Sequence, residues 1–171
     1  MKCGDRIQIN AEGDMCYITA RGASGQRVNV AKKVRGATGR VITNGAGWVM
    51  SLDNPIRVGG VSKYEVTLET SLFSIDQFIT VLEEYSHTIA RDDICVVNLD
   101  GYEYSREYGY LSAIRNKEVI IKEVKDTGEC MCQLKDQDPQ HTTYRWTPTY
   151  RISPLFLKKP LCIPLSEYLL A

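Results

Sequence analysis

Short β-type segments separated by glycine-bearing turns fill the first sixty residues of this chain, and they restrict its possible folds more than any other feature. The segments alternate polar and apolar side chains or are rich in β-branched residues. The expected strands are residues 6–9, 15–20, 27–30, 40–43 and 48–52. Asp53-Asn54-Pro55 is expected to end the last of them. Strands this short and this closely spaced predict a small barrel rather than an open sheet.

One segment departs from this pattern. Ser74 with Gln77 three residues later is typical of the capping box that begins a helix. Apolar residues then recur at helical spacing, at Ile75, Phe78, Ile79, Leu82 and Ile89. We therefore predict one amphipathic helix over residues 74–88, packed between or beside β-rich units.

The rest of the chain favours β structure again. An apolar strand is expected from Ile94 to Leu99, and residues 118–124 and 130–134 flank a Thr127-Gly128 turn as a hairpin. Another short strand is expected at residues 144–147, and the prolines that follow rule out a long C-terminal helix. The predicted fold class is mainly β with one amphipathic helix. Its units are a small barrel at 1–60, an acidic connector at 61–93 that carries the helix, and a second small barrel at 94–171 with a Pro-rich C-terminal segment.

The charge of the chain is zero in total but unevenly distributed. Residues 1–60 contain nine Lys or Arg against four Asp or Glu, which gives +5. Residues 61–111 contain three against ten, which gives −7, and residues 112–171 contain nine against seven, which gives +2. We call residues 1–60 the basic head, and its net positive charge predicts an anionic partner. Mutual neutralisation of the two halves within the fold is an equally good interpretation.

Nothing in the sequence is typical of a membrane protein, a metal site or an enzyme. No stretch approaches the roughly 18 apolar residues that cross a bilayer, and the first residues lack a signal-peptide pattern, so we expect a cytoplasmic protein. The six cysteines form no C-x-x-C pair, and Cys130 and Cys132 are spaced to face a core together as reduced thiols. We find no P-loop and no G-x-S-x-G elbow. We expect no catalytic residues, no metal and no cofactor.

A short sequence motif occurs twice, in nearly the same form, within the basic head. RGASGQRV at residues 21–28 is followed by RGATGRV at residues 35–41. The glycines indicate two β-turns, since glycine accepts positive φ without cost. Six cations fall within twenty residues with no acid among them: Arg21, Arg27, Lys32, Lys33, Arg35 and Arg40. Turn amides together with cations make a surface suited to phosphate. Two β-turns of similar sequence, with no role in binding, would explain the repeat equally well.

Two stretches of the head resemble known small barrels. Gly4-Asp5-Arg6-Ile7 resembles the entry strand of SH3-like barrels, and residues 33–42, KVRGATGRVI, resemble the KOW motif. The resemblance covers residues 1–58, with 11–32 as an insertion. It implies contact with nucleic acid or with the machinery that carries it.

The C-terminal part, residues 119–159, resembles a second SH3-like barrel. Such barrels often end in a one-turn helix, here expected where Ile152-Ser153-Pro154 follows Tyr150. A tandem of two such barrels around a helix is similar to the MotB type of bacteriophage early protein. That resemblance implies DNA binding and modulation of transcription.

Two hypotheses of function follow. In the first, the chain is a non-enzymatic, largely sequence-independent binder of double-stranded DNA that modulates transcription, with a host transcription or nucleoid protein as a further candidate partner. Its phosphate-binding residues would be the six cations above, with Trp48 and Arg57 as flanking contacts. In the second, the chain is an adaptor or inhibitor that docks on a host protein. The docking surface would be the acidic helix and a row of tyrosines on a strand, Tyr102, Tyr104, Tyr108 and Tyr110.

Overall fold

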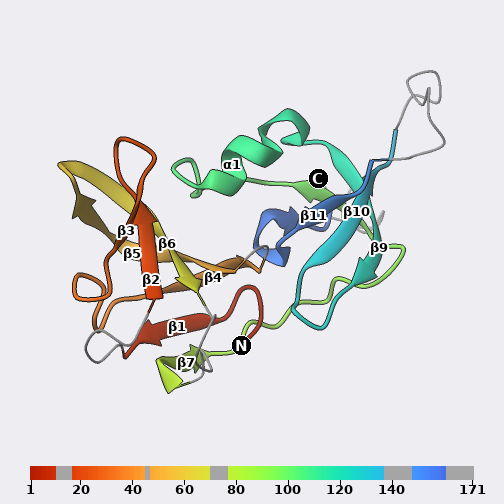
Figure 1. The fold of residues 1–171 in the computed structure, drawn as a ribbon. Helices are drawn as coiled ribbons and strands as arrows, with labels where there is room; N and C mark the ends of the chain where they lie inside the picture. Colours follow the sequence, from red (N-terminus) through yellow and green to blue (C-terminus); the bar gives the residue numbers. More distant parts are fainter. Residues whose placement is uncertain (11–16, 45–46, 70–76, 137–147, 161–171) are drawn as a thin grey trace, which may run out of the picture.

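A computed structural model describes residues 1–10, 17–44, 47–69, 77–136 and 148–160, and it is mainly β with two antiparallel sheets (Figure 1). The first sheet contains β1 (Arg6–Ile9), β2 (Tyr17–Arg21), β3 (Arg27–Asn29), β4 (Thr38–Asn44), β5 (Trp48–Val58), β6 (Val61–Glu69) and β7 (Ile79–Glu83), in the order β3-β2-β6-β5-β4-β1-β7. The second contains β8 (Ile94–Val97), β9 (Glu118–Val124), β10 (Cys130–Leu134), β11 (Tyr150–Ile152) and β12 (Leu157–Lys158), in the order β11-β10-β9-β8-β12. The helical segments are α1 (Arg106–Leu111) and the 3-10 turns η3 (Ser112–Ile114) and η5 (Pro154–Phe156).

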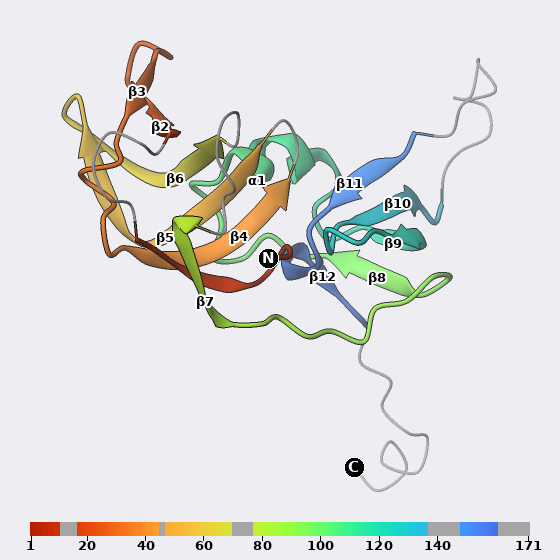
Figure 2. The same ribbon diagram turned by 60° about the horizontal axis from the view of Figure 1, so that its bottom comes forward.

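The first sheet curls into a half-barrel, and the second sheet lies beside its outer face (Figure 2). The inside of the curl holds one hydrophobic core, to which Val41 and Met50 belong. The second sheet holds another core, which also takes Ile42 and Val49 from the first sheet. Because neighbouring residues on a strand face opposite ways, β4 and β5 contribute to both cores at once.

The mainly β fold class is confirmed, and several predicted elements lie where the sequence indicated. The strand at 6–9 and the hairpin of β9 and β10 have the predicted positions. The one-turn helix expected after Tyr150 is η5, which the Ser153 side chain caps by accepting a hydrogen bond from the Leu155 N–H at 3.4 Å. The strand predicted at 144–147 lies outside the described residues.

The helix predicted at 74–88 is wrong wherever the structure describes that segment. Ile79–Glu83 form β7, an edge strand that pairs with β1, and residues 84–90 have no regular structure. The apolar residues do not share one helical face: Phe78 packs on the first core, Ile89 packs on the second, and Leu82 is exposed. Pairing with β1 therefore outweighs the local helical periodicity of a segment rich in β-branched residues.

The strand predicted to end before Asp53 continues to Val58. The register of β5 against β6 shifts between Ser51 and Ile56, which marks a bulge or irregularity. Such an irregularity accommodates Pro55, which cannot donate to a regular ladder. The first sheet also extends beyond residue 60, since β6 and β7 come from the segment that the sequence assigned to the connector.

Gly39 is required where β4 passes β5. A Cβ built at this position would lie 2.0 Å from the Ser51 carbonyl oxygen, which is backbone and cannot move aside. We therefore expect Gly39→Ala to lower the free energy of unfolding by about 2 kcal/mol or more, measured by urea denaturation. Gly25→Ala is the control, because its Cβ would meet nothing within 4 Å and only its φ of 77° is strained. It should cost about 1 kcal/mol, and equal losses in the two variants would contradict this role of Gly39.

Candidate nucleic-acid interface

The two similar motifs form two different turns. In the first, Gly25 N–H donates to the Gly22 carbonyl at 3.0 Å, closing the hairpin between β2 and β3. In the second, Ala37 N–H donates to the Val34 carbonyl at 2.9 Å, and the chain then enters β4. Gly25 and Gly36 have positive φ, of 77° and 74°, as expected of turn glycines. Two turns occur in this part of the chain as predicted, but the second lies at Val34–Ala37, and Thr38 and Gly39, which were expected in that turn, belong to β4.

Three loops carry most of the predicted cations to one end of the molecule. They are the β2–β3 turn, residues 31–36 and the β5–β6 turn, and Figures 1 and 2 both place them at the end of the first sheet away from the second sheet. Lys33 Nζ donates to the Arg57 carbonyl at 2.5 Å, which joins two of these loops. We define the basic end as the cations within these loops or near the strand ends beside them that form no ion pair with a described residue. Its members are Arg21, Lys32, Lys33, Arg35 and Arg57.

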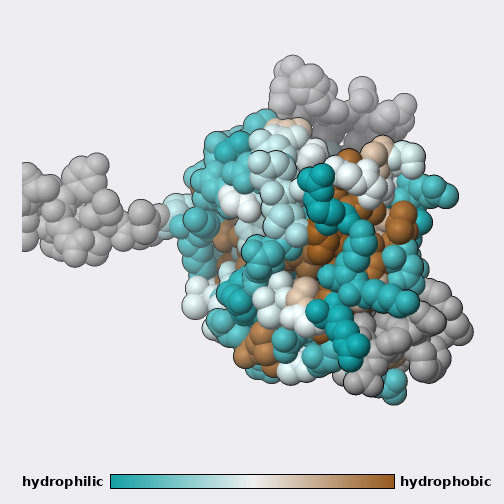
Figure 3. All heavy atoms as spheres, turned by 90° about the vertical axis from the view of Figure 1, so that its left-hand side faces the viewer, coloured by the Kyte–Doolittle hydropathy of each residue, from teal (hydrophilic) through white to brown (hydrophobic). Residues whose placement is uncertain are grey.

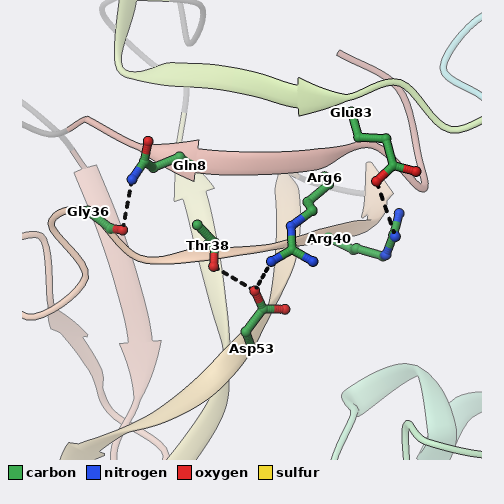
Figure 4. A network of polar contacts seen from close by, with 7 residues as sticks. All are labelled: Arg6, Gln8, Gly36, Thr38, Arg40, Asp53 and Glu83. Atoms are coloured by element: carbon green, nitrogen blue, oxygen red, sulfur yellow. Dashed lines mark hydrogen bonds and ion pairs between the residues drawn. The ribbon is translucent and has the colours of Figure 1, made fainter.

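The side chains of the basic end face solvent. All five residues are exposed, and none forms an ion pair with any residue that the structure describes. Figure 3 views this end and shows hydrophilic side chains around apolar patches. The backbone of the loop is held firmly, since the Gln8 side-chain amide donates to the Gly36 carbonyl at 3.2 Å (Figure 4). The charges are therefore available to a ligand on a defined backbone.

The remaining predicted cations, Arg27 on β3 and Arg40 on β4, are paired with carboxylates. Arg27 Nη1 is 2.6 Å from Glu69 Oε1. Arg40 donates to the Gly4 carbonyl at 3.0 Å, and its Nη2 lies 3.9 Å from Glu83 Oε2 (Figure 4). These side chains balance charge within the first sheet rather than adding to the basic end.

Arg6 explains why Arg40 needs such a partner. The two arginines are direct cross-strand neighbours on β1 and β4, an arrangement that is destabilising for like charges. Arg6 Nη2 lies 2.9 Å from Asp53 Oδ2, which also accepts from the Thr38 hydroxyl at 2.5 Å (Figure 4). The Asp53 and Glu83 carboxylates thus offset the Arg6 and Arg40 charges on one face of the sheet.

The structure separates Trp48 from the basic end. Trp48 begins β5 and packs against the first core, whereas Arg57 lies near the other end of the same strand. The two predicted flanking residues are therefore not neighbours, and only Arg57 belongs with the other cations.

The predicted tyrosine row on a strand is wrong. The segment forms the turn before α1 and the helix itself, with Ser105 as N-cap. Tyr102 packs edge-on against Phe156 with ring centroids 4.8 Å apart, and the Tyr108 hydroxyl accepts from Arg115 Nη1 at 2.9 Å. Tyr104 and Tyr110 are exposed. Only these last two offer substantial aromatic surface to a ligand.

Two carboxylates meet where β6 contacts the start of α1. Glu65 Oε1 accepts a hydrogen bond from the Arg106 N–H at 2.9 Å. Burial raises the pKa of Glu65 above its usual range, although hydrogen bonds from Ser105 and Arg106 oppose the rise. Burial also raises the pKa of Glu107, and the nearby charge of Glu65 adds to that effect. This contact therefore favours protonation of both groups.

The described cysteines are buried, as the spacing of Cys130 and Cys132 predicts. Cys95, Cys130 and Cys132 are free thiols, and burial raises the pKa of both Cys130 and Cys132 to about 12. Cys16 and Cys162 lie outside the described residues. In the described part of the chain, His, Cys, Asp and Glu side chains do not group as a metal site would require. No helix found there is long and apolar enough to span a bilayer.

Searches for similar proteins found no match among known protein families, curated proteins or solved structures.

The Glu65–Glu107 contact predicts a pH dependence of stability. A carboxyl whose folded pKa lies above its unfolded value stabilises the fold as pH falls through the folded pKa. The free energy of unfolding of the wild type should therefore gain a contribution as pH falls from neutral through the raised folded pKa values toward the ordinary glutamate pKa of about 4.3. Glu107→Gln removes that group, so its unfolding free energy should rise less over the same interval, measured by urea denaturation.

Glu123→Gln is the matched control for this prediction, because it removes an exposed carboxylate on β9. The prediction fails if Glu107→Gln and Glu123→Gln show the same dependence on pH as the wild type.

Proposed function

We propose that this chain is a non-enzymatic protein that binds the phosphate backbone of double-stranded DNA through the basic end. The observation that carries the proposal is the set of exposed cations in and beside three loops at one end of the first sheet, with no ion-pair partner among the described residues. Cations in this state can replace the counterions condensed on DNA, and the release of those counterions drives binding. Cations already paired with a carboxylate, such as Arg27 and Arg40, gain less from a phosphate.

Binding of this kind is largely independent of sequence. Base readout in the major groove usually requires a helix or a two-stranded ribbon that presents side chains to base edges. Within the described residues the α-helix is α1, which has six residues and lies outside the basic end. Contacts from turn cations would go mainly to phosphates, which carry no sequence information.

A role in modulating transcription is part of the proposal. It is supported by the resemblance of residues 33–42 to the KOW motif, a stretch that here spans the Val34–Ala37 turn and enters β4. The likeness to MotB-type phage proteins suggests a cytoplasmic setting and a host transcription or nucleoid protein as a further partner. The adaptor hypothesis relied on a helix and a tyrosine row, and the structure arranges both segments differently.

Charge reversal in the basic end tests the proposal. We expect Lys32→Glu/Arg35→Glu to weaken binding of a random-sequence duplex strongly at about 50 mM salt, measured by fluorescence anisotropy. The slope of log affinity against log salt should fall in magnitude by about 2, because each of the two cations would otherwise neutralise one phosphate. Both residues are exposed, so the fold should be retained.

Lys117→Glu/Lys122→Glu is the matched control, with the same change in net charge at exposed positions flanking and within β9. It should bind as the wild type does, and so should Arg40→Gln. Equal weakening by the two double variants would mean that net charge, and not the basic end, controls binding. Absence of duplex binding by the wild type at about 50 mM salt would reject the proposed function.

A further inference from the structure

A pair of stacked tyrosines at the protein surface lies beside the basic end. The rings of Tyr64 and Tyr104 are 4.6 Å apart between centroids and inclined by 12°, which is parallel stacking. Tyr64 is on β6, and Tyr104 is in the turn before α1. Tyr104 is 75 % exposed, the highest value among the large hydrophobic side chains of the described residues. One face of its ring therefore rests on Tyr64 while the rest of the ring meets solvent.

The folding of the chain does not explain this exposure. Neither ring belongs to the two described cores or to the residues packed on them, whereas Tyr102 and Tyr108 of the same segment pack on the second core. An exposed aromatic ring that is pre-oriented by a stacked neighbour loses little conformational freedom when a further flat ring is added to the stack. The geometry is therefore suited to a planar ligand.

The position of the pair along β6 connects it to the basic end. Ser62 of β6 is the cross-strand partner of Arg57, and Tyr64 follows two residues later, about 7 Å along the strand. Lys63, between them, forms no ion pair with the described residues. A phosphate held near Arg57 would thus place the neighbouring nucleotides of an extended strand within reach of Tyr104.

The acids next to the pair are already engaged by the protein. Glu65 accepts from the Arg106 N–H at 2.9 Å, and Glu103 accepts from the Gly101 N–H at 3.2 Å. The Glu65 and Glu103 carboxylates do not cover the stacked rings, but their negative charge disfavours several consecutive phosphates next to the tyrosines. The arrangement fits a ligand that brings a base to the tyrosines and its phosphates to the basic end.

We propose that Tyr104, held by its stack on Tyr64, is a platform for an unpaired base of a single-stranded nucleic acid whose flanking phosphates lie on the basic end. This rests on the proposed function, and it extends the ligand from duplex DNA to single strands. Every base has a π-face, so the platform is tolerant of sequence. Bases in a duplex are stacked on one another and do not reach the tyrosine.

The sequence alone offers little indication of this site. Tyr64 stands alone in Ser62-Lys63-Tyr64-Glu65, forty residues before its partner, and only the fold brings the two rings together. The exposure of Tyr104 likewise depends on its place in a turn and not on a strand.

The test measures the affinity of the protein for fluorescent oligo(dT) and oligo(rU) of about fifteen nucleotides and for a random-sequence duplex, by fluorescence anisotropy at one salt concentration. Tyr104→Ala should weaken oligo(dT) binding by about 5- to 100-fold, the effect of removing one base–aromatic stack. It should leave duplex affinity unchanged. Tyr104→Phe, which keeps the ring, should restore single-strand binding, and the exposed Tyr110→Ala is the matched control. The oligo(rU) arm shows whether the platform accepts RNA as well as DNA.

A crosslinking experiment locates the contact. Oligo(dT) carrying one 5-iodouracil is bound to the wild-type protein and irradiated with ultraviolet light. The crosslink should form at Tyr104. The proposal is overturned if the wild type does not bind oligo(dT), or if Tyr104→Ala and Tyr110→Ala bind it as the wild type does. Either result with duplex binding intact leaves the proposed function standing. Two results together support both proposals. Lys32→Glu/Arg35→Glu binds neither the duplex nor the single strand, and Tyr104→Ala binds the duplex but not the single strand.

Discussion

Burial of β4 and β5 on both faces is the constraint on which the rest of the structure depends. Val41 and Met50 point into the curl of the first sheet, while Ile42 and Val49 point into the core of the second. Ile42 lies at a register shift between Val41 and Thr43, and such irregularities often re-aim a side chain. The second sheet must therefore dock on the outer face of the first. A backbone hydrogen bond also joins the two parts of the fold: the Cys3 N–H, before β1, donates to the Thr127 carbonyl, between β9 and β10, at 2.8 Å. The loops of the basic end lie away from this contact and stay open to solvent.

The same architecture decides which cations can act on a ligand. Arg27 on β3 and Arg40 on β4 each lie within reach of a carboxylate two strands away in the same sheet, Glu69 on β6 and Glu83 on β7. The cations of the basic end lie in the loop of residues 31–36 or near the ends of β2 and β5, and they have no such carboxylate among the described residues. Their long side chains extend into water. The density of cations in the sequence therefore overstates the size of the binding surface. Which cations the fold pairs with carboxylates gives a better measure of that surface.

Much of the fold follows from local patterns, and the exceptions have a common cause. Residues 6–9 and the hairpin of β9 and β10 alternate as their burial demands, so their periodicity predicts them well. Residues 75–89, which include β7, also show a clear periodicity, but it is helical and does not match the fold, because Phe78 and Ile89 pack on different cores. The candidate site divides in the same way. Turn glycines and exposed cations can be recognised in the sequence, whereas the pairing of Arg40 and the stacking of Tyr64 depend on contacts between distant segments.

The zero net charge does not weaken the case for an anionic ligand, because charge acts locally at physiological salt. The acidic middle segment forms ion pairs with Arg27, Arg40, Arg115 and Lys159. The Arg27–Glu69 pair borders the basic end, since Arg27 is the cross-strand partner of Arg21, but no cation of the basic end itself is paired with a described residue. Two interpretations that the sequence left open, neutralisation within the fold and an exposed basic surface, are therefore both realised, by different cations of the chain. Fields from exposed charges are screened within about 8 to 10 Å at such salt. A phosphate that approaches the three loops would thus respond mainly to the cations of the basic end and little to the carboxylates beyond them.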